Sequence, residues 1–386
     1  MTLTAEIASE TAMPAGAAVV EIAQRLVPQI AAGAAEADAE DRFVAENYAL
    51  LRDAGLVEAG VPRELGGGGA DVRDLAAMLR VLGRACGSTA LAFSMHTHQV
   101  AIPAWRWRHQ KVAAVEPLLK RIASDRIFLL SSGGSDWING SGEARKVEGG
   151  YRISGRKIFT SGAAAGDVFM TGAVLEEDGE RYVLHFGASM KAPEVRILDT
   201  WHTLGMRGTG SHDVVLDNLF VPDAAVALKR KAGEWHPLFH TISTIAFPLI
   251  YAAYLGVADS ACDIALGLAR KRPMTHDMRA LAGRMMTELR GAEVAHASML
   301  AAVDRNAPSA ETVNDVMIGK TLGADHAIRA VELAMELASG AGFYRAAGLE
   351  RRFRDIQGAR YHAMQRGPQA QYAGALALGE SVATVF

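Results

Sequence analysis

The first third of the chain carries hydrophobic side chains at helical spacing. In residues 71–87 one set recurs every three or four positions, namely Val72, Leu75, Leu79 and Leu82. This spacing puts the set on one face of a helix. Asp71 stands just before it, where a carboxylate can cap the first turn, and Gly83 and Gly87 are expected to close the segment. We predict a helical domain over residues 1–125.

The pattern changes to short alternating runs between residues 126 and 230. VEGGYRISG has Gly149 and Gly150 between two extended segments, and VLEEDGERYVLHFGA turns around Asp178 and Gly179. Glycine and aspartate at such places favour tight β-hairpin turns. A third run, HDVVLDNLFVP, alternates apolar and polar residues and stops at a proline. We predict a β domain over residues 126–230.

Helical spacing returns after residue 231 and persists to the end of the chain. Leu281, Met285 and Leu289 lie four positions apart, which indicates one long helix. A second wide apolar face carries Val313, Val316, Met317, Leu322, Ile328 and Val331. Long amphipathic helices with short connections are typical of a bundle. The region 231–386 is therefore predicted to be a helical bundle, with apolar faces wide enough to favour an oligomer.

Composition excludes several classes of partner. Forty basic and 43 acidic side chains give a net charge of −3, so the sequence gives no electrostatic reason to expect nucleic acid. The run of about 18 apolar residues that a membrane helix needs is missing, so no membrane insertion is expected. Cys86 and Cys262 carry no CxxC or zinc-like spacing, and the N-terminus lacks the pattern of a signal peptide. A cytoplasmic location is therefore predicted.

Four segments together resemble the acyl-CoA dehydrogenase superfamily over nearly all of residues 20–386. They are AENYALLRDAGLVEAGVPRELGGGGAD, KIFTSGAAAGD, LGMRGTGSHDVVLDNLFVP and ELASGAGFYRAAGLERRFRD. The resemblance implies an α+β fold with an N-terminal helical domain, a central β-barrel-like domain and a C-terminal four-helix bundle. It also implies a homotetramer that holds a flavin, FAD with FMN as an alternative, between the β domain and the bundle.

The resemblance assigns the central strand-to-turn segment to the flavin ring. Phe159 would pack on the ring, Thr160 would lie beside it, and the hydroxyl of Ser161 would lie near its N5 atom. An aromatic face excludes water, and a hydroxyl can hydrogen-bond a ring nitrogen. Gly134 and Ser135 match a glycine-serine-aspartate stretch that helps to bind the cofactor phosphates, and Ser131 is a looser candidate.

Residues in the bundle would meet a partner subunit's cofactor. By the same resemblance these are Arg270 or Arg272, Glu336, Gly340 and Gly342. A helix cap is the structural alternative for the segment ELASGAGF.

The carboxylate that a dehydrogenase of this family needs is missing at both expected places. Such an enzyme oxidises an acyl-CoA thioester, and a glutamate takes the α-proton while the flavin takes a hydride. The matching positions fall near Ala363, after the pair Arg354-Asp355, and near Ala246. Alanine cannot accept a proton, so a base would have to come from elsewhere in the chain.

Three functions are compatible with this departure. The first is oxidation of an acyl-CoA or similar small thioester, with an electron-transfer protein as partner. The second is a two-component monooxygenase, supplied with reduced flavin by a flavin reductase, in which a C4a-hydroperoxide forms with oxygen. Relatives of that kind carry histidines in the helical domain and after the arginine-aspartate pair, which His96, His98 and His362 match. The third is a flavin-binding protein without chemistry. No metal site is predicted, because two nearby histidines lack further ligands.

Overall fold

The structure is a computed structural model that describes residues 15–383. The predictions made for the N-terminal segment before residue 15 lie outside these described residues. The first region is helical, as predicted. Its helices are α1 (Ala15–Ala32), α2 (Ala34–Ala39), α3 (Ala45–Asp53), α4 (Val72–Ala85), α5 (Gly87–Gln110) and α6 (Glu116–Asp125).

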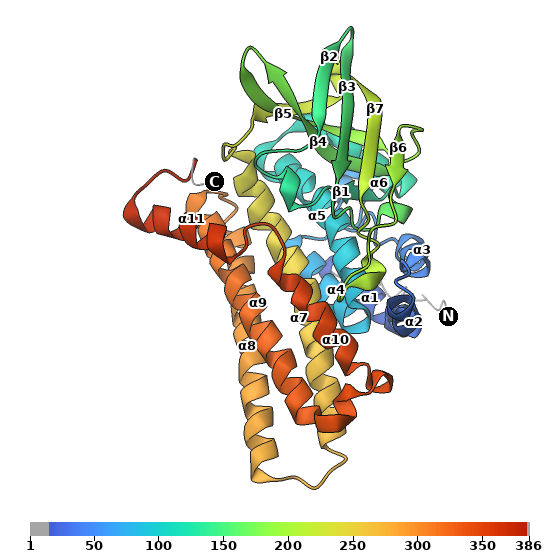
Figure 1. Cartoon of the computed structure of the whole chain (residues 1–386), viewed down its shortest axis with the longest axis vertical. Helices are drawn as coiled ribbons and strands as arrows, with labels where there is room; N and C mark the ends of the chain where they lie inside the picture. Colours follow the sequence, from blue (N-terminus) through green and yellow to red (C-terminus); the bar gives the residue numbers. More distant parts are fainter. Residues whose placement is uncertain (1–14, 384–386) are drawn as a thin grey trace, which may run out of the picture.

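One eight-stranded sheet forms the central region (Figure 1). Its strands are β1 (Leu129–Ser131), β2 (Glu143–Val147), β3 (Gly150–Lys157), β4 (Val168–Glu177), β5 (Glu180–Ser189), β6 (Val195–Ile197), β7 (Val214–Pro222) and β8 (Val226–Lys231). The order is β6-β7-β3-β2-β4-β5-β8, and β1 pairs with β4. Three short 3-10 helices matter below: η3 (Gly134–Asp136), η5 (Arg207–Thr209) and η7 (Ser339–Phe343).

The predicted hairpin turns are present. Glu177 pairs with Glu180 across a two-residue turn at Asp178 and Gly179, which both have positive φ, as this tight turn requires. In the other hairpin Gly150 already pairs with Val147. The turn is therefore residues 148–149, one position earlier than predicted.

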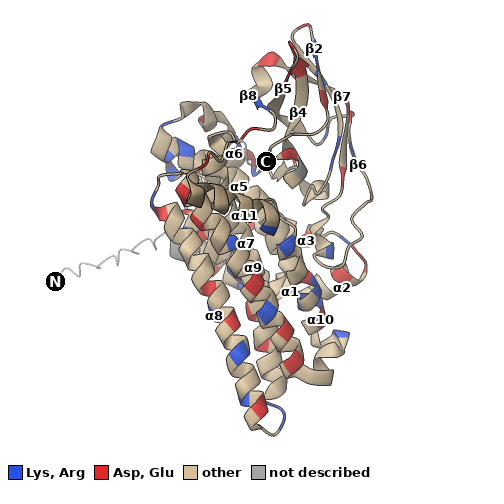
Figure 2. Cartoon of the chain, turned by 60° about the vertical axis from the view of Figure 1, so that its left-hand side comes forward, with Lys and Arg blue, Asp and Glu red and all other residues tan. Residues whose placement is uncertain are grey.

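Long helices make up the C-terminal region, as the spacing indicated. They are α7 (Leu238–Ala269), α8 (His276–Asp304) and α9 (Ala310–Ala338), followed by the shorter α10 (Leu349–Ile356) and α11 (Arg366–Leu378). Figure 1 shows α7, α8 and α9 side by side, with the β domain above one end of the bundle. In Figure 2 the positions of acidic and basic residues are interspersed along these helices, in line with the small net charge.

Helix α7 is the central helix of the molecule. By length and composition it could cross a membrane, but 94% of its most apolar window is buried inside the structure. Helix α4 crosses it closely, because a Cβ on Gly83 would lie 2.4 Å from the carbonyl oxygen of Ala253. The prediction that Gly83 ends its helix was wrong: α4 continues to Ala85, and Gly83 allows this close crossing. Asp71 does cap α4, through a hydrogen bond from the backbone N–H of Asp74.

Candidate functional site

Two loops of the β domain meet where Ser161 was predicted to face a ligand. The backbone N–H of Gly162 donates to the carbonyl of Thr209 at 2.8 Å, and that of Thr160 donates to the carbonyl of His212 at 3.1 Å. These two bonds tie the segment after β3 to the segment before β7. As a result Ser161 and Ser211, fifty positions apart in sequence, face each other.

Three buried hydroxyls form a chain at this junction. The Oγ atoms of Ser161 and Ser211 lie 2.8 Å apart, and Ser211 Oγ lies 2.7 Å from Thr209 Oγ1. Thr209 Oγ1 then donates to the carbonyl oxygen of Met206 at 2.9 Å. All three hydroxyl-bearing residues are buried. The sequence motif pointed to Ser161 but not to its two partners.

An uncovered aromatic ring lies next to this chain. Phe159 is 51% exposed, has a positive φ, and touches only the edge of Trp201 among the aromatic rings described. The neighbouring Thr160 Oγ1 is buried, and the described residues offer it no hydrogen-bond partner. An exposed ring beside an unpaired hydroxyl is suited to a flat ligand with polar edge atoms.

The loop from β1 into η3 approaches the C-terminal region. Ser131 ends β1, while Gly134 and Ser135 begin η3. A Cβ on Gly134 would lie 3.1 Å from the Cβ of Ala363. The position at which the family resemblance expects a glutamate therefore does face the predicted phosphate loop, and here it is occupied by alanine.

A buried ion pair anchors the far side of that loop. Lys157 is fully buried, and its Nζ lies 3.0 Å from Asp136 Oδ2, the last residue of η3. The ammonium also donates to the carbonyls of Ser141 at 2.7 Å and of Gly172 at 2.5 Å. Burial lowers the pKa of Lys157, and the Asp136 charge opposes that shift. The pair fixes the loop with respect to the sheet.

A second polar cluster joins α7, α9 and the segment after α10. Tyr254 on α7 and Nε2 of His362 are 2.8 Å apart. Tyr251, one turn earlier, donates to the carbonyl of Ala359 at 2.6 Å. Lys320 on α9 is buried and donates to the carbonyl of Met364 at 2.7 Å. Each contact therefore fixes the segment that carries His362 and Ala363.

Burial favours the uncharged forms of the ionisable side chains in this cluster. The pKa of His362 is lowered to about 3, mainly by burial and then by Lys320 and His98. The pKa of Lys320 is lowered to about 8 by burial, and burial raises that of Tyr254 well above 10. At neutral pH the imidazole is therefore uncharged, and the tyrosine keeps its proton.

The other two predicted histidines lie on α5 with different surroundings. His98 is close enough to His362 to lower its pKa, whereas its Nδ1 contacts the carbonyl of Ser94. His96 points elsewhere, as two positions on a helix require. Its Nε2 contacts the carbonyl of Val57 at 2.8 Å, and its Nδ1 accepts from the N–H of Leu129 at 3.0 Å. Both ring nitrogens of His96 are thus used to join the helical domain to β1.

The residues predicted to contact a partner subunit's cofactor lie at the end of the bundle away from the β domain. Arg270 caps α7, Arg272 donates to the carbonyl of Leu337, and Glu336 is exposed near the end of α9. Gly340 and Gly342 lie in η7, which follows that helix. Figure 1 shows this end of the bundle far from the β domain. Within one chain these residues do not meet Ser161, so their predicted contact with a cofactor requires a second subunit.

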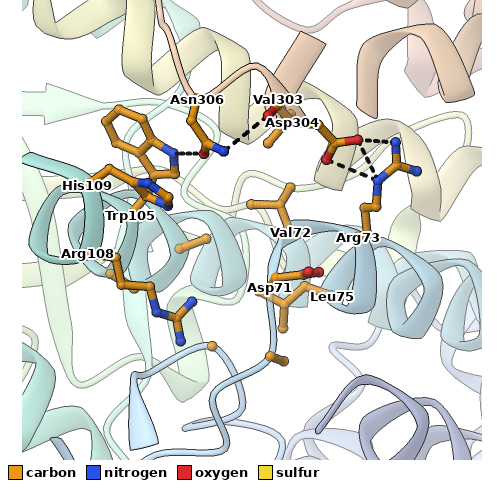
Figure 3. A pocket seen from close by; sticks show the side chains of 14 residues that line it. Asp71, Val72, Arg73, Leu75, Trp105, Arg108, His109, Val303, Asp304 and Asn306 are labelled. Carbon is orange, nitrogen blue, oxygen red and sulfur yellow. Dashed lines mark hydrogen bonds and ion pairs between the residues drawn. The ribbon is translucent and has the colours of Figure 1, made fainter. Parts of the chain in front are cut away.

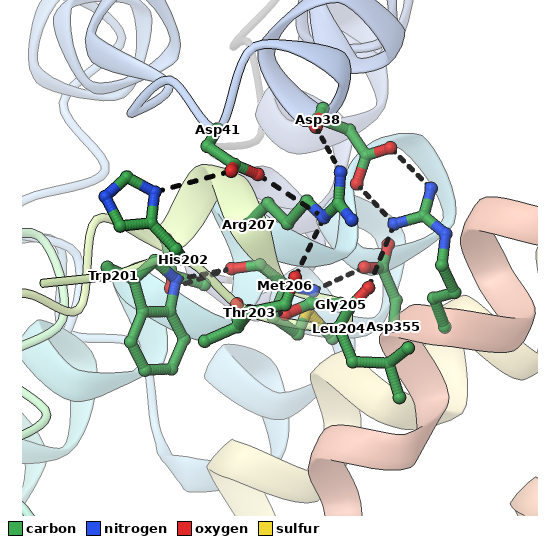
Figure 4. Close-up of polar contacts among 12 residues, drawn as sticks. Asp38, Asp41, Trp201, His202, Thr203, Leu204, Gly205, Met206, Arg207 and Asp355 are labelled. Carbon is green, nitrogen blue, oxygen red and sulfur yellow. Dashed lines mark hydrogen bonds and ion pairs between the residues drawn. The ribbon is translucent and has the colours of Figure 1, made fainter.

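The loop before η5 is held from both helical regions (Figure 4). The N–H of Met206 donates to Asp355 Oδ1 at 2.6 Å, and Arg207 pairs with Asp41 at 3.3 Å. Arg354 donates to Asp38 at 2.9 Å and to the carbonyl of Leu204. Burial raises the pKa of Asp355 to about 6, against the bond from Met206. These contacts fix the Met206 peptide, on which the hydroxyl chain ends.

A separate cavity of about 230 Å³ lies between α4, α5 and the end of α8 (Figure 3). Its polar rim is already paired: Arg73 binds Asp304, and Trp105 Nε1 donates to Asn306 at 2.9 Å. Neither Ser161 nor His362 lines it. Across residues 15–383 there is no group of three or more potential metal ligands.

The chain folds into a helical domain, a strand-rich domain and a helical bundle. The exposed ring of Phe159 and the unpaired hydroxyl of Thr160 lie where two loops of the β domain meet. This arrangement fits a flavin-binding fold. Three family descriptions match the chain: the acyl-CoA dehydrogenase N-terminal domain over residues 17–120, the middle domain over 131–219 and the C-terminal domain over 248–363. The chain belongs to the acyl-CoA dehydrogenase superfamily. This confirms the predicted family and fold.

Several known proteins are similar over almost the whole chain. Amino sugar nitrososynthase DnmZ of Streptomyces peucetius is 26% identical and covers 96% of this chain and 95% of its own. A pigment production hydroxylase of a Rhodococcus species is 26% identical, covering 88% and 90%. The structure of KijD3 with FMN and a dTDP-linked 3-amino sugar has a TM-score of 0.89 at 26% identity, covering 97% and 96%.

These similarities make the chain a flavin-dependent oxidoreductase, as predicted, rather than a flavin-binding protein without chemistry. Its own residues fit such a cofactor. The exposed face of Phe159 and the unpaired hydroxyl of Thr160 are available to a planar ring. Gly133 leaves room beside Phe159, since a Cβ there would lie 2.8 Å from the Phe159 Cβ.

Proposed function

We propose that the protein is a monooxygenase that uses reduced flavin and molecular oxygen, with a separate reductase supplying the flavin. Bound reduced flavin would activate oxygen for transfer to a small-molecule substrate. One observation carries the proposal: Ala363 faces the predicted phosphate loop at the place where acyl-CoA oxidation needs a carboxylate. The second expected place, Ala246, is buried in α7 and is equally unable to accept a proton.

The carboxylates near the cluster have other partners. Asp355 and Asp325 are the two whose charges raise the pKa values of Tyr254 and Tyr251. Asp355 accepts the Met206 N–H, and Asp325 pairs with Arg366. Using either as the base of a dehydrogenase would require breaking these contacts. The alternative of acyl-CoA oxidation therefore has less support, although it is the activity after which the family is named.

We infer that His362 and His98 bind the substrate's polar group as neutral hydrogen-bonding residues. The depressed pKa of His362 keeps its ring uncharged at neutral pH, and Tyr254 orients it. A ring without charge can accept or donate a hydrogen bond without attracting water to a dry site. His96 has no nitrogen left for a substrate, so we assign it a structural role.

An amine is the substrate class that these surroundings favour. Oxygen transfer to nitrogen requires an uncharged amine with a free electron pair. Burial and the like charge of Lys320 disfavour a second positive charge nearby, so a bound amine would lose its proton more readily. The relatives that act on amino sugars, and the dTDP-amino sugar bound to KijD3, support the same class.

Two assays on one preparation test the proposal. Oxidised flavin-loaded protein is titrated anaerobically with acyl-CoAs of several lengths, and the flavin absorbance is recorded. Reduced FMN or FAD is then supplied with labelled oxygen and a dTDP-linked amino sugar, and products are analysed by mass spectrometry. We expect no bleaching by acyl-CoA and one labelled oxygen atom on the amine nitrogen. Bleaching by a thioester would overturn the monooxygenase proposal in favour of a dehydrogenase.

A further inference from the structure

The hydroxyl chain at Ser161 has a direction that its geometry fixes. A carbonyl oxygen accepts hydrogen bonds and cannot donate them. The Met206 carbonyl therefore takes the single hydroxyl proton of Thr209 at 2.9 Å. Thr209 Oγ1 is then left as an acceptor toward Ser211, which donates its own proton across 2.7 Å. Ser161 in turn donates to Ser211 across 2.8 Å.

The carbonyl at the end of the chain is held firmly in place. Met206 O also accepts the N–H of Thr209 at 3.1 Å and the indole Nε1–H of Trp201 at 3.1 Å. On the other side of the residue, the Met206 N–H is bound by the buried carboxylate of Asp355. A carbonyl with three donors cannot turn away, so the order of donors and acceptors is set by fixed backbone.

We infer that Ser211 and Thr209 are positioning residues that make Ser161 a hydrogen-bond acceptor toward flavin N5, so that the site prefers reduced over oxidised flavin. Oxidised flavin has a lone pair at N5, whereas reduced flavin carries a hydrogen there. A serine whose proton is already used can accept from N5–H, but it presents only lone pairs to the oxidised ring. This inference rests on the proposed function, and on the family resemblance, which implies that the hydroxyl of Ser161 lies near N5.

The preference has a consequence for an enzyme fed by a reductase. Flavin that arrives reduced would be retained, and flavin that has been oxidised would lose a favourable contact and leave. A dehydrogenase needs the opposite arrangement, because its oxidised ring must bind first and accept hydride. The same serine can serve either reaction, and the orientation of its proton distinguishes them.

Flavin affinities in the two redox states test the inference. Dissociation constants of FMN and FAD are measured anaerobically, oxidised and photoreduced, for the parent protein and for Ser211→Ala. The substitution frees the Ser161 proton to donate to oxidised N5. One hydrogen bond of ordinary strength should lower the ratio of oxidised to reduced dissociation constants about fivefold. The potential of the bound flavin should become more negative by about 20 mV.

Three further variants separate orientation from packing. Thr209→Val breaks the chain at its other link and should lower the ratio in the same direction, whereas Thr209→Ser keeps the hydroxyl and should not. Thr89→Val removes a buried hydroxyl bonded to Asn47 in the helical region, and it should leave the ratio unchanged even if it lowers stability.

The outcomes distinguish this inference from the proposed function. A parent protein that prefers reduced flavin, with the same ratio in Ser211→Ala and Thr209→Val, would overturn the oriented chain and leave the monooxygenase standing. A parent that binds oxidised flavin more tightly and is bleached by acyl-CoA would overturn both. A ratio that falls in the two chain-breaking variants and is kept in Thr209→Ser supports the inference.

Discussion

Mild acid should destabilise this protein, because its buried histidines are held uncharged. Burial lowers the pKa of His96 and of His98 to about 4, and that of His362 to about 3. His96 shows the cause most clearly. Its Nδ1 accepts the Leu129 N–H, so its Nε2–H must donate to the carbonyl of Val57. A second ring proton would point at another N–H and break the link to β1.

The sign and size follow from proton linkage. Between the unfolded pKa near 6.5 and the folded value, the unfolded chain binds a proton that the folded chain does not, so stability falls as pH falls. From about pH 7.5 to about pH 5 each of the three histidines costs about 2 kcal/mol, about 6 in all. Asp355, whose pKa is raised to about 6, acts in the opposite direction by about 1.4 kcal/mol. The balance of these four groups is a loss of about 4 to 5 kcal/mol, a large part of the stability of an ordinary domain. His185, whose pKa burial also lowers to about 4, adds to the loss.

Urea unfolding at the two pH values, followed by tryptophan fluorescence, measures this loss. His96→Gln removes one titrating ring, so the difference between the two pH values should shrink by about 2 kcal/mol. His276→Gln, at the exposed start of α8, is the matched control and should leave the difference as it is. A parent protein that loses less than about 1 kcal/mol would refute the reasoning.

Three further perturbations address the ion pair of Lys157 with Asp136 and the polar cluster around His362. Lys157→Met leaves a buried carboxylate without its partner and should destabilise the protein by about 3 kcal/mol in urea unfolding; a loss near zero would contradict the anchoring role. Tyr254→Phe removes the 2.8 Å contact with His362 and should slow product formation about fivefold with little change in stability. Equal turnover would remove Tyr254 from the site. Lys320→Met should raise the pKa of His362, because that lysine lowers it. Histidine-selective NMR, recorded at decreasing pH while the protein is still folded, measures the onset of His362 protonation; an unchanged or later onset would disprove the coupling.

Local sequence signals were enough wherever local chemistry decides the structure. The Asp178-Gly179 turn needs two residues that tolerate positive φ, and both are adjacent in sequence. The cap at Asp71 depends on a residue three positions away. The prediction that Phe159 and Ser161 face a flavin likewise rests on a short motif in one strand-to-turn segment. In each case the interacting groups lie within a few residues of each other.

The partners of Ser161 could not be found in this way. Ser211 and Thr209 reach it only because the loops around β3 and β7 are paired in one register. A shift of that register by one residue would displace the loop before β7, and Ser211 with it, relative to Ser161. Likewise Lys320 lies on α9 and His362 on the segment after α10, and packing of that segment against α7 and α9 brings them together. Side-chain neighbours of this kind depend on tertiary packing, which periodicity does not specify.

One signal for the polar cluster around His362 is nevertheless present in the sequence. Lys320 follows Val316 and Met317 at helical spacing, so it falls on the buried face of α9, and Lys157 is likewise buried at the end of β3. Lys157 has Asp136 as its partner, which accounts for its burial. In the part of the chain that the structure describes, Lys320 has no carboxylate within ion-pair distance. Burying such a charge costs stability that an apolar residue would not. The lysine donates to the Met364 carbonyl and lies over the rings of Phe247 and Tyr251. It also adds to the burial that lowers the pKa of His362. A charged residue on an apolar helical face is thus a sign of the proposed substrate site that periodicity alone can reveal.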